Sequence, residues 1–128
     1  MRQASRPVFC LIVEADPTSG LDLADAVDRI GWYVAGPFAR GREALSWLGR
    51  FTPDVAVIGR DLADGSGAEL VRELLARGVP VATRVRPAGL ERPEPASGPV
   101  APALPRRMAP ALARLMRAST LELVDGAL

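Results

Sequence analysis

Short continuous apolar runs alternate along the chain with segments in which apolar residues recur every three or four positions. The apolar runs occupy residues 8–13, 32–36, 55–58 and 79–83. Continuous runs of this length are typical of strands that are buried on both faces of a parallel sheet. The segments between them predict helices, so the first 83 residues predict an open α/β sheet with helices on both faces.

Each of the three helices predicted in this region has one apolar face. In the first helix, which ends at Gly31, this face consists of Leu21, Ala24, Val27 and Ile30. The second helix is predicted at residues 42–50, and the third begins at residues 65–67 and ends before Gly78.

The pattern changes after residue 83. Six prolines lie within residues 86–105, and proline at this density removes backbone donors and interrupts helices. We therefore predict an irregular, proline-rich segment at residues 86–105, with Val100-Ala101 as a candidate fifth strand at the sheet edge. An amphipathic helix is predicted next, at Arg107–Arg117.

The composition limits the chemistry that this chain can perform. We predict one domain over residues 1–128, with tails at residues 1–6 and 119–128. The chain has no histidine and a single cysteine, Cys10, which excludes histidine-based catalysis, the common zinc sites and an internal disulfide. The net charge is +1 and no apolar stretch is long enough to span a membrane, so neither nucleic-acid nor membrane binding is predicted. We expect a cytoplasmic protein that is not an enzyme and has no metal or cofactor.

Four segments resemble the receiver domain of bacterial two-component response regulators. They are residues 9–17 with their acidic turn, residues 34–37, residues 53–67 and residues 79–81. The resemblance covers roughly residues 8–85. It implies a flavodoxin-like fold, which is a doubly wound, five-stranded parallel sheet with strand order 2-1-3-4-5, in which the region of the fourth helix is here irregular and proline-rich.

The same resemblance implies which residues stand at the phosphorylation site. The family uses an acidic pair after the first strand and an acceptor aspartate after the third to hold magnesium, which neutralises the transferring phosphoryl group. A Thr or Ser and a Lys then read the phosphorylated state. Glu14 matches the first acid, but Ala15 stands at the second and Gly59 at the acceptor position. Val85 stands at the Thr or Ser position and the chain contains no lysine, so the resemblance implies a degenerate site.

Other charged residues near this site are each open to two interpretations. Asp16 either replaces the missing second acid or caps the following helix. Asp61 either forms a weak cation-binding corner with Glu14 and Asp16 or lies in a solvated loop and pairs with Arg60. Arg60 or Arg84 either places a guanidinium in the vacated pocket or points to solvent.

Two functions are consistent with these residues. The first is a phosphorylation-independent pseudo-receiver that acts in two-component-type signalling by binding a protein partner or a second copy of itself. The binding surface would be the proline-rich segment and the Arg107–Arg117 helix. The alternative is a small-ligand or anion-binding module that reuses the pocket vacated at Gly59. An enzyme with a carboxylate-only mechanism is the least favoured function.

Overall fold

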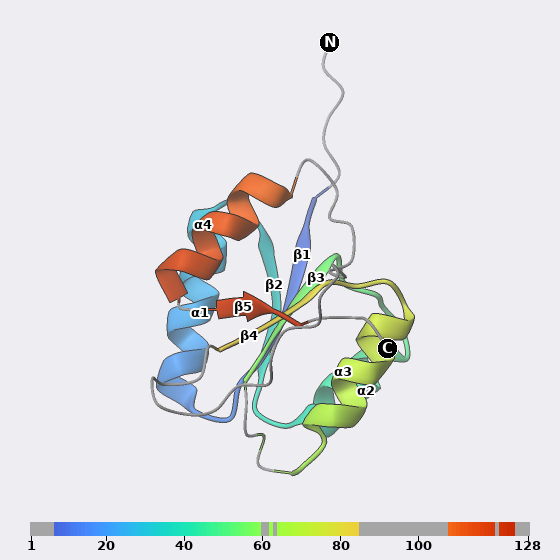
Figure 1. The fold of residues 1–128 in the computed structure, drawn as a ribbon. Coiled ribbons are helices and arrows are strands. Elements are labelled where there is room, and N and C mark those ends of the chain that lie inside the picture. The colour runs from blue at the N-terminus through green and yellow to red at the C-terminus, as the bar shows by residue number, and fades with distance from the viewer. Residues whose placement is uncertain (1–6, 60–61, 63, 85–107, 120, 125–128) are drawn as a thin grey trace, which may run out of the picture.

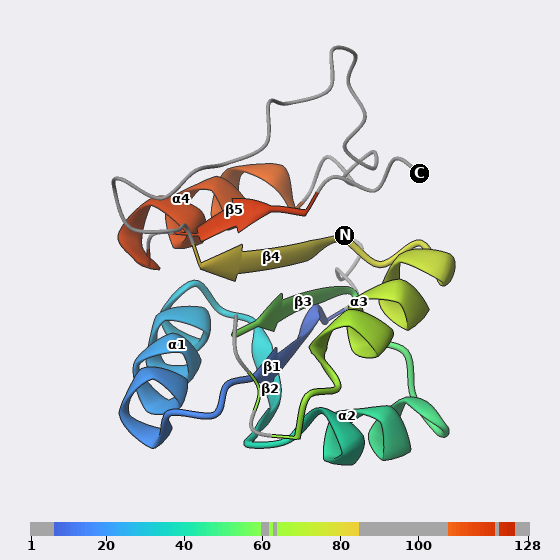
Figure 2. The same cartoon turned by 60° about the horizontal axis from the view of Figure 1, so that its bottom comes forward.

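The computed structural model describes residues 7–59, 62, 64–84, 108–119 and 121–124. Its strands are β1 (Phe9–Val13), β2 (Tyr33–Phe38), β3 (Val55–Ile58), β4 (Val81–Arg84) and β5 (Leu121–Leu123). Its helices are α1 (Pro17–Arg29), α2 (Gly41–Leu48), α3 (Gly67–Ala76) and α4 (Ala109–Ser119). The strands form one sheet, with α1 and α4 on one face and α2 and α3 on the other (Figure 1, Figure 2).

The sheet has the strand order β2-β1-β3-β4-β5, which confirms the predicted order. β1 pairs in parallel with β2 and with β3, and β3 pairs in parallel with β4. The carboxyl ends of these four strands therefore meet at one edge of the sheet, which is where open α/β sheets place their ligand sites.

The fifth strand differs from the predicted all-parallel sheet. β5 is antiparallel to β4 and follows α4 in the chain, within the segment that was predicted to be a tail. Leu121 and Leu123 both add to the core on the α1 side of the sheet, and this burial accounts for a strand directly after α4. The candidate strand at Val100-Ala101 and the whole of residues 86–105 lie outside the described residues.

Alternation along the strands divides the buried side chains into two cores. Because successive strand residues point to opposite faces, Cys10 and Ile12 pack with α1 and α4, whereas Leu11 and Val13 pack with α2 and α3. Cys10 is fully buried, and this burial raises the pKa of its thiol to about 12. The single cysteine is therefore an unreactive core residue.

The buried face of α1 is rotated from the predicted one. Leu23 and Val27 are buried, whereas Leu21, which was assigned to the apolar face, is 66% exposed. Gly20 also lies on the buried face, and a Cβ added there would be 3.3 Å from Cβ of Pro37. None of the helices in the described residues is long and apolar enough to cross a membrane.

Candidate functional site

Glu14 and Gly59 lie side by side at the carboxyl edge of the sheet. β1 and β3 are in register up to Val13 opposite Ile58, and the N–H of Gly59 donates to the carbonyl of Val13 at 2.7 Å. Glu14, the residue that follows β1, is therefore adjacent to Gly59. A Cβ added to Gly59 would be 2.8 Å from Oε1 of Glu14 and 3.0 Å from Oε2. The carboxylate of Glu14 thus occupies the space in which a side chain at position 59 would begin.

The Glu14 carboxylate is oriented by its own turn. Its Oε2 accepts a hydrogen bond from the N–H of Asp16 at 3.2 Å, and the N–H of Glu14 donates to the carbonyl of Phe38 at 2.9 Å. Glu14 and Ala15 are both half-buried. The acidic turn is therefore fixed between the ends of β1 and β2, with its carboxylate directed at Gly59.

Asp16 caps α1 in the structure. Its backbone is extended, and its Oδ2 accepts a hydrogen bond from the N–H of Ser19 at 3.1 Å, directly before Pro17 at the first helical position. A side-chain oxygen in this geometry satisfies one of the amides left unpaired at a helix start. Of the two interpretations of Asp16, the structure has the helix cap.

The described residues do not fit a magnesium site of the receiver type. Gly59 has no side chain that could supply a metal ligand, and the Asp16 carboxylate is engaged as a cap. Among the described residues, no three carboxylate or thiol side chains lie close enough to share a metal ion. Arg60, Asp61, Val85 and the side chain of Arg84 lie outside the described residues.

Asp64 is an important residue of this edge that the sequence analysis did not identify. Its Oδ1 accepts hydrogen bonds from the Ser66 hydroxyl at 2.7 Å and from the N–H groups of Gly41 and Ser66, both at 3.3 Å. Its Oδ2 accepts from the N–H of Arg42 at 3.0 Å. The loop after β3 thereby caps the start of α2. One sequence signal was available, because the residue before α2 is Arg40, whose side chain cannot accept a capping hydrogen bond.

Gly41 allows α2 and the β3–α3 loop to approach this closely. A Cβ added at this position would clash with the hydroxyl of Ser66. The hydrogen bonds, with the one from Ser66 contributing most, lower the pKa of the Asp64 carboxyl from 3.8 to about 2. Two carboxylates therefore define this edge of the sheet. Glu14 lies beside Gly59, and Asp64 connects the loop before α3 to the start of α2.

We expect Asp64→Asn to lower the melting temperature at neutral pH. Because the pKa of Asp64 is lower in the folded state than its ordinary 3.8, its charge contributes stability above about pH 4, and this contribution is lost as the pH falls to about 2. The difference between wild type and variant should therefore shrink over that range in thermal unfolding curves. Asp22→Asn, at an exposed position of α1, is the control. A difference that is independent of pH would contradict a charge-based role.

Comparisons with known proteins agree with this architecture. No family model matches the sequence, and no curated protein matches it. Among solved structures, the chain is similar to the receiver (REC) domain of the PhyR response regulator of Erythrobacter litoralis, determined by solution NMR. The TM-score is 0.55 at 30% sequence identity, over 60% of this chain and 61% of that domain, so the match spans less than two thirds of either chain. With the strand order β2-β1-β3-β4-β5, this similarity shows that the chain has the receiver-domain fold of the response regulators.

Proposed function

We propose that this chain is a pseudo-receiver that acts in two-component-type signalling by binding another protein, without being phosphorylated. The observation that carries the proposal is the pairing of Gly59 with the Glu14 carboxylate. Glycine has no group that can accept a phosphoryl group, and the space beside it already holds a negative charge. A single conformation is consistent with this pairing, because phosphorylation of residue 59 cannot shift an equilibrium between two states.

The hydrogen bonds of Asp64 support a fixed conformation as well. They connect the β3–α3 loop to the first amides of α2, those of Gly41 and Arg42. A charge-assisted network of this kind strengthens the packing of a loop against a neighbouring helix. The loop after the acceptor position is thus tied to the start of α2.

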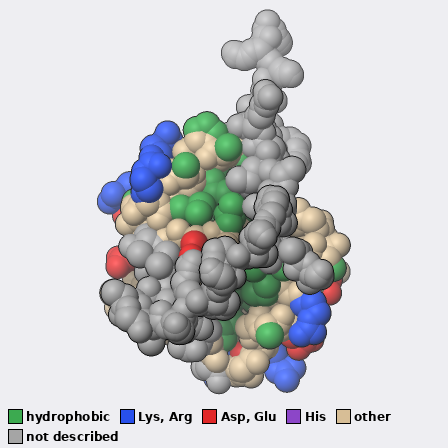
Figure 3. All heavy atoms as spheres, viewed as in Figure 1, with side chains coloured by type: hydrophobic (Ala, Val, Ile, Leu, Met, Phe, Trp, Pro, Cys, Tyr) green, Lys and Arg blue, Asp and Glu red, His purple; other side chains and the backbone are tan. Residues whose placement is uncertain are grey.

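The surface that we propose for partner binding is the outer face of α4. Leu112 and Leu115 of α4 are buried against the sheet, whereas Arg114 and Arg117 are exposed. Figure 3 shows basic side chains gathered over α4 next to hydrophobic ones. Paired positive charge beside apolar surface favours a partner with acidic residues around an apolar contact.

An affinity experiment with the native host's proteins tests this proposal. We expect wild type to retain one identified protein partner, and the double variant Arg114→Glu/Arg117→Glu to lose it. Arg72→Glu, on the opposite face of the sheet, is the control and should keep the partner. Incubation with acetyl phosphate and magnesium should change neither the intact mass nor partner binding. A stable phosphoprotein would overturn the proposal.

The same protein preparation tests the alternative of an anion-binding module. The Glu14 carboxylate beside Gly59 disfavours an anion there, because like charges repel in a half-buried site. Saturable thermal stabilisation by inorganic phosphate or by nucleotides would favour the alternative over partner binding.

A further inference from the structure

Four of the six aromatic residues of the chain gather around one hollow at the amino edge of the sheet. The hollow has a volume of about 410 Å³ and is lined by Phe9, Val34, Ala35, Trp47, Phe51 and Thr52, with Tyr33 next to it on β2. Phe9, Tyr33 and Phe51 are 42%, 58% and 54% exposed. Exposure of this many large apolar side chains at one place is unusual for a surface without a ligand.

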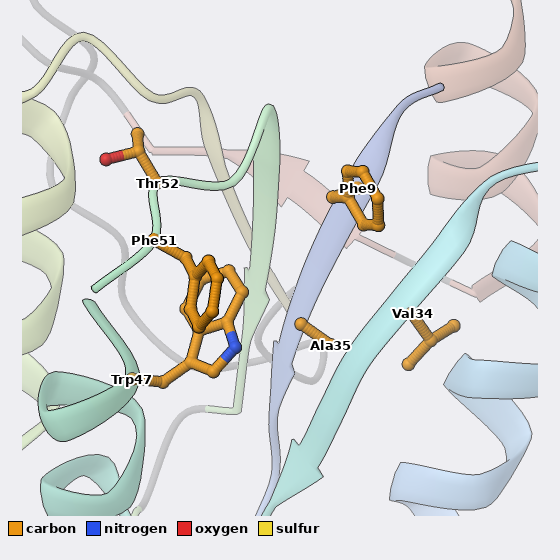
Figure 4. A pocket seen from close by; sticks show the side chains of 6 residues that line it. All are labelled: Phe9, Val34, Ala35, Trp47, Phe51 and Thr52. Atoms are coloured by element: carbon orange, nitrogen blue, oxygen red, sulfur yellow. The ribbon is translucent and has the colours of Figure 1, made fainter. Parts of the chain in front are cut away.

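The aromatic side chains form two pairs. Phe9 and Tyr33 stack with ring centroids 5.3 Å apart, and Trp47 and Phe51 lie with centroids 5.2 Å apart. Figure 4 shows Trp47 and Phe51 on one side of the hollow and Phe9 on the other, with the small side chain of Ala35 between them. The volume lies within the range of about 300–1,000 Å³ found for small-molecule sites. A planar ring fits between two aromatic walls of this kind, and stacks favourably on each.

A cationic group stands at the Thr52 end of this hollow. Nη1 of Arg77 donates to the Thr52 hydroxyl at 3.0 Å and to the carbonyl of Phe51 at 3.3 Å. Nε of Arg77 donates to Glu73 at 2.8 Å, which leaves Nη2 without a bond to the described residues. Because Glu73 is 44% exposed, this surface ion pair offsets only part of the guanidinium charge. The hollow therefore combines apolar walls with a positively charged rim.

We propose that this hollow binds a planar aromatic carboxylate. The ring lies between the Phe9–Tyr33 and Trp47–Phe51 pairs, and the carboxylate lies against Nη2 of Arg77 and the Thr52 hydroxyl. Guanidinium and carboxylate form strong, directional hydrogen bonds. The site is independent of the proposed partner surface on α4, because Trp47 of α2 and Arg77 at the end of α3 lie on the face of the sheet opposite to α4 (Figure 2).

Titration of the wild-type chain with 2-naphthoate, followed by amide and indole NMR signals, tests this site. We expect saturable shifts of the Trp47 indole N–H and the Thr52 amide, with no shift of the buried Trp32 indole. The neutral 2-naphthalenemethanol and the cationic 2-naphthylmethylamine should bind at least about tenfold more weakly than 2-naphthoate, because neither can form the charged hydrogen bonds to Arg77. Equal binding of all three compounds would overturn the role of Arg77.

Two variants separate the site from the fold. Arg77→Gln should weaken 2-naphthoate binding about tenfold, whereas Arg72→Gln, at an exposed position of the same helix, should leave it unchanged. Phe51→Ser removes an aromatic wall at an exposed position and should abolish binding. The NMR signals of the other residues should show that the variant is still folded. Absence of saturable shifts at millimolar 2-naphthoate would overturn the proposal. The proposal would also be overturned if analytical ultracentrifugation showed a wild-type dimer that dissociates in the Phe51→Ser variant, since a second copy would then cover the aromatic surface.

Discussion

Gly59→Asp will lose about 1–3 kcal/mol of unfolding free energy and will not become phosphorylated. Its Cβ falls 2.8 Å from Oε1 of Glu14, so the Glu14 side chain must leave its position, and a second carboxylate then faces the first. Overpacking and like-charge repulsion both oppose folding, at a cost of this order. The second acid that would hold magnesium is also missing, because Ala15 stands at its position and the carboxylate of Asp16, the next residue, caps α1. Chemical denaturation measures the stability, and intact mass after acetyl phosphate treatment measures the phosphorylation.

Three further variants identify the cause of this loss. Gly59→Asn has the same shape without the charge and should lose less than Gly59→Asp. Gly59→Ala should cost less than about 1 kcal/mol, because the end of the flexible Glu14 side chain can move and because alanine restricts the unfolded chain. In a Glu14→Gln background the cost of Gly59→Asp should decrease, which a double-mutant cycle measures. An appreciable phosphorylated fraction of Gly59→Asp would show that the remaining residues still support phosphoryl transfer.

Leu112→Ala will destabilise the domain by about 2–5 kcal/mol, the usual cost of a cavity at a fully buried leucine. Leu112 is 1% exposed and belongs to the same core as Leu23 and Val27 of α1. Its loss therefore removes packing between α4 and the rest of the fold. Arg114→Ala, at an exposed position of the same helix, should change the stability by less than about 0.5 kcal/mol. A loss below about 1 kcal/mol for Leu112→Ala would mean that α4 contributes little to the core.

The sequence predicted the parallel part of the sheet because each of its strands coincides with a short, mainly apolar run. It did not predict β5, which has only three residues, Leu121-Glu122-Leu123. A segment this short carries too little pattern to identify it as a strand, and nothing in it specifies the antiparallel direction. The direction depends on the burial of Leu121 and Leu123 beside α4, which is a tertiary contact.

The error in α1 has a local cause. The predicted face and the observed face share Ala24, Val27 and Ile30. They differ only near the start of the helix, where Leu21 was predicted to be buried and Leu23 is buried in its place. Gly20 is buried close to Pro37. Because glycine has no apolar side chain, the hydrophobic pattern does not show that this turn of the helix is buried. Periodicity alone therefore could not decide which leucine faces the sheet.

At the candidate site, the sequence identified which chemistry is missing but not what replaces it. The acceptor aspartate is absent because residue 59 is glycine, and this can be seen from the sequence alone. The position of the Glu14 carboxylate depends on a side-chain rotamer, and the capping of α2 by Asp64 joins residues 22 and 23 positions apart. Such contacts form only after the strands have brought the loops together, so no local pattern encodes them.

The direction of β5 decides where a reporter attached to the C-terminal end of this domain would sit. Because β5 runs opposite to β4, the N–H of Val124 donates to the carbonyl of Val81, at the amino end of β4. The backbone thus leaves the sheet at the edge that carries the aromatic hollow, away from Gly59. A fluorophore or fusion partner joined after this point is tethered to the hollow's end of the molecule. Labels meant to sense Glu14 and Gly59 are better placed at exposed positions of α1 near its start.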